Sequence, residues 1–204
     1  MITIGITGGV GCGKSKILEY IKENYNCRII TADDVANTLK EPGKACYEPL
    51  IKLLGNKILD EDGFINKKKM AEVIFSNDSL LDKVNAIIHP AVKDYILDAK
   101  ETEIQAGKYD YLFIEAALLI ECGYNEYVDQ MWYIFTSESI RIQRLKISRG
   151  YSEEKIKGIM DAQLSEEQFR AGSDFCIDNS GTLAQTYMQI NKKMKELESE
   201  DGRK

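Results

Sequence analysis

The chain has 204 residues, of which 44% are hydrophobic and 29% are charged, and its formal net charge is -6. This length and composition predict an ordinary globular protein with one sizeable core and room for a small insertion, and they exclude a disordered or fibrous chain. The acidic balance argues against a surface that follows nucleic-acid phosphates, so no nucleic-acid partner is expected.

The first predicted element is a short β-strand at residues 2–7, which is followed by a glycine-rich turn. Behind the turn, Ile17, Leu18 and Ile21 recur at the spacing of one helix face. A second β-rich run, "CRIITA" at 27–32, follows at the distance expected of two parallel strands that are joined by a crossover helix. The chain is therefore predicted to open with a βαβ unit.

Three further runs are predicted to be strands: "YLFIEA" at 111–116, "MWYIFT" at 131–136 and "DFCIDN" at 174–179. Each run is nearly continuous in apolar residues and does not alternate with polar ones. Such runs are typical of strands that are buried on both faces of a parallel sheet. We therefore expect a parallel sheet with helices on both sides.

Two long stretches between the strands are helical in pattern. Residues 66–106 contain no strand candidate and are predicted to form a helical insert. Residues 138–168, which "SRGYS" interrupts, are rich in arginine and are expected to form a lid. The charged tail is predicted to be an amphipathic helix that frays after Leu197. The whole pattern predicts one α/β domain with two helical elaborations.

Cysteine usage and hydropathy indicate the compartment. The five cysteines include no C-x-x-C pair and the chain has one histidine, so neither a zinc site nor a disulfide framework is expected. "MITIGITGG" does not resemble a signal peptide, and the apolar run "AALLI" is far shorter than the ~20 residues of a membrane span. We expect a cytoplasmic protein with no membrane partner, as a monomer or weak oligomer.

The turn after the first strand, "GGVGCGKS" at 8–15, matches G-x-x-x-x-G-K-[ST] between a predicted strand and a predicted helix. Glycines let backbone N–H groups turn toward a phosphate, and the helix adds its positive end. Lys14 is expected to reach the β- and γ-phosphates of a nucleoside triphosphate, and Ser15 to ligate a bridging Mg²⁺. The predicted nucleotide-binding residues here are Gly8, Gly9, Val10, Gly11, Cys12, Gly13, Lys14, Ser15 and Lys16. The alternative is a turn that merely connects a strand to a helix.

The second strand ends in "TADD", which places Asp33 and Asp34 at the carboxyl edge of the predicted sheet. Ligands of parallel sheets bind at that edge, and an aspartate there can accept the proton of an attacking hydroxyl. The alternative is that one of the two aspartates caps the following helix, and both roles can hold together. The guanine-reading pattern N/T-K-x-D is missing at "NKKK" and "NKKM", which disfavours a GTP switch.

Arg141, Arg144 and Arg149 follow the fourth predicted strand. At 100° per residue the first two lie on one helix face and Arg149 is about 80° from Arg141, so two or three of them can converge on one anion. The alternative is a solvated basic face with acidic partners from "SEEK" and "LSEEQF". His89, which precedes Pro90, is expected to mark a helix boundary more readily than a catalytic group.

From about residue 2 to residue 185 the chain resembles the dephospho-coenzyme A kinases. These enzymes use ATP to phosphorylate the ribose 3′-hydroxyl of dephospho-coenzyme A, which gives coenzyme A and ADP in the last step of coenzyme A synthesis. The segments that carry the resemblance are "GITGGVGCGKS", "TADDVA", "EPG" at 41–43, "IHP" at 88–90, "ALLIE" at 117–121 and "QLSEEQFRAGSDFCIDNSG".

The resemblance implies a P-loop kinase fold, an α/β three-layer sandwich with a five-stranded parallel sheet, a helical substrate-binding insert and a helical lid. It implies a core at 1–59, 107–137 and 171–204. A coenzyme-binding region at 60–106 and a lid at 138–170, which closes over ATP, complete the implied single domain. Two alternatives remain: another P-loop kinase of nucleotides or small molecules such as shikimate, and a switch that binds ATP without transferring it.

The resemblance also implies site roles. Asp33 matches the proton-accepting aspartate of the family, and it is expected to contact the coenzyme as well. The other implied residues are Lys14, Arg144 and Arg149 for catalysis, Asn179 for ATP, His89 and Glu121 for the coenzyme, and Ser15 for Mg²⁺. The chain departs from the family pattern at Thr31, Asn37, Ala117 and Ser148. Arg149 is expected to replace the lid arginine that the family usually has at the position of Ser148.

Overall fold

The structure, a computed structural model, describes residues 1–75 and 77–201. The chain divides into two compact units, the first formed by Met1–Ile29 and Tyr109–Lys204 and the second by Ile30–Lys108. The coenzyme-binding region that the resemblance implies begins at residue 60, whereas the second unit already includes residues 30–59. Within the described ranges no helix is long and apolar enough to span a membrane.

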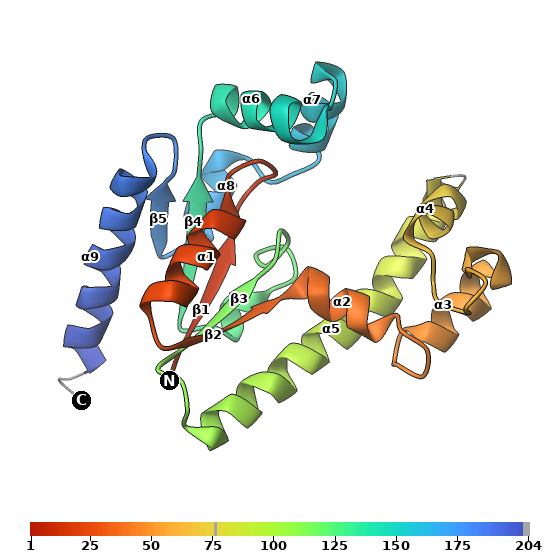
Figure 1. Cartoon of the computed structure of the whole chain (residues 1–204), viewed down its shortest axis with the longest axis horizontal. Coiled ribbons are helices and arrows are strands. Elements are labelled where there is room, and N and C mark those ends of the chain that lie inside the picture. Colours follow the sequence, from red (N-terminus) through yellow and green to blue (C-terminus); the bar gives the residue numbers. More distant parts are fainter. Residues whose placement is uncertain (76, 202–204) are drawn as a thin grey trace. The chain divides into compact units, whose positions relative to one another are not determined.

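A five-stranded sheet has all its strands parallel and in the order β2-β3-β1-β4-β5 (Figure 1), and it lies in the first unit except for the last two residues of β2. The strand β1 pairs with β3 and β4, so that Ile6 lies opposite Glu115 on one side and Trp132 on the other. The strands are β1 (Ile2–Thr7), β2 (Cys27–Thr31), β3 (Tyr111–Glu115), β4 (Gln130–Phe135) and β5 (Phe175–Asp178). The α/β fold and the five predicted strands are confirmed.

Helices cover both faces of this sheet, as predicted. On one face α1 (Lys14–Asn24) and α9 (Leu183–Asp201) bury apolar side chains against β1, β3, β4 and β5 (Figure 1). On the other face, Phe169 of α8 (Glu166–Ala171) stacks on Tyr133 with ring centroids 4.8 Å apart. The predicted helical tail is present, since α9 continues to Asp201 and Leu197 is buried in the sheet's core, while its fraying after Leu197 stays a prediction.

Three consecutive helices form the predicted lid segment: α6 (Glu138–Arg149), α7 (Glu153–Asp161) and α8. Gly150, with φ 61°, ends α6 in the left-handed conformation that favours glycine. The Ser152 hydroxyl then accepts the Lys155 N–H and caps α7. At the predicted interruption "SRGYS", α6 thus ends and α7 begins after a short turn.

The second unit is built around the 29-residue helix α5 (Asp78–Ala106), which contacts α2, α3 and α4. The shorter elements of the second unit are α2 (Ala32–Leu39), α3 (Tyr47–Leu54), η1 (Asn56–Ile58) and α4 (Lys67–Phe75), and the first unit also holds η2 (Tyr124–Glu126). The predicted helix boundary at Pro90 is wrong, since α5 runs through Pro90. Val84 and Val92 are buried on either side of it, so packing on both sides compensates for the N–H that proline lacks.

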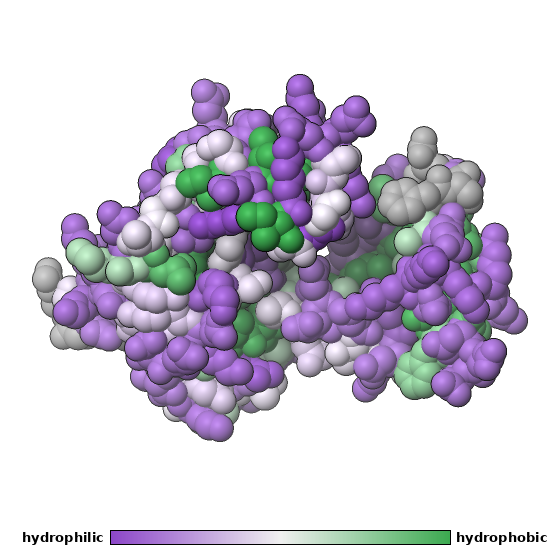
Figure 2. Space-filling view, turned by 45° about the horizontal axis from the view of Figure 1, so that its top comes forward, coloured by the Kyte–Doolittle hydropathy of each residue, from purple (hydrophilic) through white to green (hydrophobic). Residues whose placement is uncertain are grey.

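Hydrophilic side chains cover most of the face seen in Figure 2, which agrees with the high content of charged residues. The most exposed large apolar side chains are Ile147 on α6, which is 79% exposed, and Met188 on α9, which is 69% exposed. They belong to different elements, and single exposed apolar side chains are normal on a globular protein.

Candidate active site

The phosphate loop, residues 8–13, connects β1 to α1 in the first unit. Gly13 is the N-cap of α1 and has φ 90°, which side chains with a Cβ rarely adopt. A Cβ at this position would lie 2.5 Å from Asn179 Nδ2. The loop therefore needs glycine here both for its backbone angle and for the close approach of Asn179.

The carbonyl of Cys12 is the point at which the loop is fixed to the sheet. It accepts hydrogen bonds from Thr136 Oγ1 at 3.0 Å, from Asn179 Nδ2 at 2.8 Å and from Arg144 Nη1 at 3.3 Å. Arg144 Nη2 also donates to the Asn179 carbonyl at 3.0 Å. Thr136 follows β4 and Asn179 follows β5, so the carboxyl ends of two strands hold the loop.

These contacts place two predicted site residues, Asn179 and Arg144, directly beside the loop. They also reveal Thr136, a loop contact that sequence reasoning missed. Asn179 is 2% exposed, and its Oδ1 accepts from the Thr186 hydroxyl at 3.0 Å, which fixes the side-chain amide. Thr136 was missed because a threonine at a strand end carries no distinctive pattern. Its role depends on β4 lying next to β1, which no local sequence pattern reveals.

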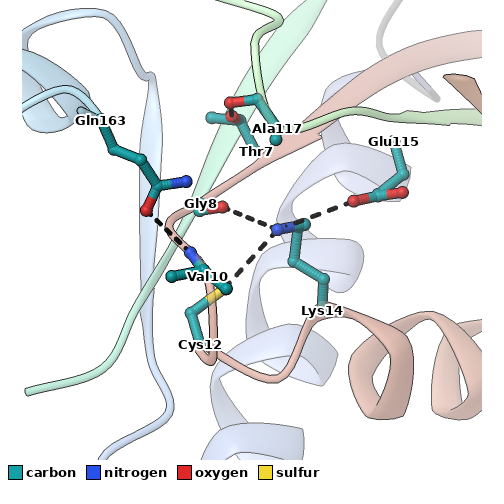
Figure 3. A network of polar contacts seen from close by, with 8 residues as sticks. All are labelled: Thr7, Gly8, Val10, Cys12, Lys14, Glu115, Ala117 and Gln163. Atoms are coloured by element: carbon teal, nitrogen blue, oxygen red, sulfur yellow. Dashed lines mark hydrogen bonds and ion pairs between the residues drawn. The ribbon is translucent and has the colours of Figure 1, made fainter. Parts of the chain in front are cut away.

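The Lys14 ammonium lies over the loop (Figure 3). It donates to the Gly8 carbonyl at 2.7 Å, approaches the Cys12 sulfur at 4.0 Å and forms an ion pair with Glu115 Oε1 at 3.7 Å. Sequence reasoning missed Glu115, although a carboxylate at the end of a predicted strand was an available signal. Lys14 and Glu115 side chains are each 15% exposed, so this pair is largely shielded from water.

Ser15 and Lys16 follow in the first turn of α1 and are both exposed. Ser15 Oγ forms no hydrogen bond within the part of the chain that the structure describes. The Lys16 ammonium forms an ion pair with Glu19 at 2.6 Å, and the hydrogen bond between them raises the pKa of Lys16.

Among the described residues no cluster of three or more acidic, histidine or cysteine side chains could hold a metal. A single free hydroxyl suits Mg²⁺, which takes its other ligands from water and phosphates.

Two of the three predicted lid arginines reach the phosphate loop. Arg141 Nε donates to the Val10 carbonyl at 2.8 Å, and Arg144 binds the Cys12 carbonyl. Arg149 is exposed at the end of α6, and its guanidinium lies 5.8 Å from the centre of the Tyr151 ring. None of the three forms an ion pair with a carboxylate in residues 1–75 and 77–201, so the alternative of a basic face paired with acidic neighbours is not what the structure shows.

The second unit holds the predicted acceptor-side aspartate. Asp33 and Asp34 lie in the first turn of α2, but Thr31 is the N-cap. The Thr31 hydroxyl accepts the Asp34 N–H at 3.3 Å and donates to the Asp34 carboxylate at 2.6 Å. The alternative that an aspartate caps this helix is therefore wrong, and the exposed Asp33 carboxylate has no hydrogen-bond partner among the described residues.

Lys40 lies seven residues after Asp33, on the same face of α2. Burial lowers the pKa of Lys40, the nearby charge of Lys67 lowers it further, and Asp33 opposes both effects. His89 is exposed on α5 in this unit, whereas Glu121 is exposed in the turns after β3 of the first unit.

A family model and the related sequences agree on one family. Residues 2–185 match the family described as dephospho-CoA kinase. The dephospho-CoA kinase of Geobacillus kaustophilus is 32% identical over 93% of this chain and 93% of its own length. That of Aquifex aeolicus is 34% identical over 97% and 98%. The solved structure of a dephospho-CoA kinase from Campylobacter jejuni has the same fold, with a TM-score of 0.73 and 22% identity over 98% of both chains.

Proposed function

Because the chain belongs to the dephospho-CoA kinase family, we propose that the phosphate loop, Lys14 and Arg144 bind ATP and stabilise the phosphoryl group during its transfer. The protein is a phosphotransferase that catalyses the last step of coenzyme A synthesis, the phosphorylation of dephospho-CoA. The observation that carries the proposal is the anchoring of one glycine-rich loop by Thr136, Arg144 and Asn179.

On the donor side, the anchored loop presents backbone N–H groups to the phosphates of ATP, apart from those of Val10 and Cys12, which bind Gln163 Oε1 and the Gly9 carbonyl. Asn179 supports the loop from β5 and thereby contributes to the ATP site. Lys14 neutralises charge on the β- and γ-oxygens, and Arg144 stabilises charge that spreads over the migrating phosphoryl group. Since Arg144 already contacts the loop, little reorganisation is needed when that charge develops.

Ser15 fits a magnesium ligand, because its hydroxyl is exposed in the first turn of α1 and forms no other hydrogen bond in the described ranges. Bound there with the phosphates, Mg²⁺ would neutralise charge on the β- and γ-oxygens. The residues 8–14 would hold the same phosphates from their other side.

On the acceptor side, Asp33 accepts the proton of the ribose 3′-hydroxyl of dephospho-CoA. The 3′-oxygen then forms a bond to the γ-phosphorus of ATP while the bond between that phosphorus and the leaving ADP oxygen breaks. The exposed Asp33 carboxylate, which forms no hydrogen bond among the described residues, supports this role. His89 and Glu121 are proposed to contact the coenzyme, and Arg149 to approach ATP when the lid, residues 138–170, closes.

The test is an ADP-release assay with ATP, Mg²⁺ and purified protein, in which dephospho-CoA is the acceptor. We expect ADP release only when dephospho-CoA is present, and a product phosphorylated at the ribose 3′-oxygen. Shikimate and nucleoside monophosphates serve as control acceptors. Release of ADP with one of these controls, or binding of ATP without any acceptor-dependent turnover, would contradict the proposal.

A further inference from the structure

Both backbone groups of Val10 are bound by side chains of the lid segment. The Val10 N–H donates to Gln163 Oε1 at 2.9 Å, a contact visible in Figure 3. The Val10 carbonyl accepts from Arg141 Nε at 2.8 Å. Arg141 Nη2 also donates to Gln163 Oε1 at 3.2 Å, which closes a three-membered network. One residue of the phosphate loop is thus held at its N–H and at its C=O by the same pair of side chains.

The two side chains come from separate parts of the lid. Arg141 lies in the first turns of α6, whereas Gln163 lies in the connection between α7 and α8. They are 131 and 153 residues away from Val10 in the sequence. The network therefore joins the beginning of the phosphate loop to both ends of the lid segment.

The residue before Val10 is adapted to this contact. A Cβ built at Gly9 would collide with the Arg141 guanidinium, whose Cζ would lie 2.7 Å from it. The guanidinium consequently lies directly against the loop backbone. This close approach requires glycine at position 9, independently of any contact that the glycine makes with a phosphate.

Arg141 and Arg144 contact different halves of the phosphate loop: Arg141 binds Val10 and Arg144 binds Cys12. They lie one turn apart on α6, and Arg144 binds the Cys12 carbonyl together with Thr136 and Asn179. The second half of the loop is therefore fixed by strand ends as well as by α6. In the first half, Lys14 binds the Gly8 carbonyl and the Cys12 N–H binds the Gly9 carbonyl, but Val10 is held by lid side chains, so its position depends on the position of the lid.

We propose that Arg141 and Gln163 are positioning residues that couple the lid to the phosphate loop and thereby set the affinity of the enzyme for ATP. The proposal rests on the proposed function, in which the loop binds ATP. Loss of either side chain leaves a backbone group of Val10 without its partner and lets the first half of the loop move before ATP binds. The acceptor side is not part of this network.

The main variant is Gln163→Met, which keeps the size of the side chain and removes the acceptor oxygen. We expect the Kd of a non-hydrolysable ATP analogue and the KM for ATP to rise by about 5- to 10-fold, as for the loss of one hydrogen bond. The KM for dephospho-CoA and the kcat should stay within about 2-fold, because the reacting groups are unchanged. Gln143→Met is the matched control, since Gln143 is exposed on α6 and its side chain has no hydrogen bond among the described residues.

A double-mutant cycle separates this role from simple stabilisation of the fold. Arg141→Met should raise the KM for ATP like Gln163→Met, and the double variant should be little worse than either one, since both side chains act on Val10. Arg141→Lys provides a milder variant if Arg141→Met does not fold, and melting curves check each protein. An unchanged KM and Kd for ATP in folded Gln163→Met would overturn the coupling. If wild-type protein binds the analogue but does not phosphorylate dephospho-CoA, the proposed function fails instead, and the analogue Kd still tests the coupling.

Discussion

The two compact units differ in how firmly they hold their candidate site residues. In the first unit, Lys14, Arg144 and Asn179 each bind a carbonyl of the phosphate loop or its surroundings. In the second unit, Asp33 and His89 are exposed, and the carboxylate of Asp33 has no hydrogen bond in the described ranges. The protein itself therefore organises the phosphate loop, whereas no hydrogen bond from the described residues orients the Asp33 carboxylate.

Lys14→Ala tests the organised side and should have the largest effect. Removing the ammonium takes away charge stabilisation at the β- and γ-oxygens, and we expect transfer to fall by about 10³-fold or more. Steady-state ADP release measures it. An activity within tenfold of wild type would show that the loop backbone suffices without Lys14.

Asp33→Asn tests the less organised side and should lower kcat by about 10²-fold. This loss is at the low end of the rate effects of general bases, because phosphoryl transfer passes through a loose transition state. The exposed carboxylate has no hydrogen bond within the described residues, although its charge acts on Lys40, so the melting temperature and the Kd of the ATP analogue should change little. Asp34→Asn is the control at the neighbouring position. Equal turnover of Asp33→Asn and wild type would refute the assignment of the base.

A pair of glycine substitutions compares the backbones of the two units. Gly13 and Gly43 both have positive φ, at 90° and 78°, but only Gly13 has a neighbour that a Cβ would strike. Gly43→Ala should cost about 1 kcal/mol of unfolding free energy from backbone strain. Gly13→Ala should cost about 1–2 kcal/mol more, because Asn179 must move. Urea unfolding measures both, and equal losses would contradict the tighter packing of the donor side.

The smallest expected effect concerns Lys40, whose pKa is lowered chiefly by burial. The unfolded chain binds the proton more tightly than the folded chain, so the stability contributed by this group rises with pH between the lowered and the ordinary lysine pKa. Lys40→Met should therefore stabilise the protein at about pH 7 by less than about 1 kcal/mol, since the ammonium is only half buried. This advantage should shrink toward about pH 10. Lys52→Met is the exposed control, and an equal gain there would remove burial as the cause.

Local sequence patterns predicted the strands and the phosphate loop, because continuous apolar runs and glycine spacing act over short distances. The contacts of the loop were not predictable in the same way. Glu115, Thr136 and Gln163 reach it only because distant segments become neighbours in the fold. Pro90 misled the prediction for the opposite reason, since its local preference is overcome by packing along α5.

The placement of Arg141 and Arg144 on one stripe of α6 restricts the lengths of chain that this fold can accept. Inserting or deleting one residue between Thr136 and Arg141 would rotate both guanidinium groups by about 100° around the helix, and the loop would lose both at once. At Gly150 a Cβ would meet no atom within 4 Å, and the turn that follows α6 is exposed. Among related chains, changes in length should therefore collect after α6 and be absent between β4 and its first arginine.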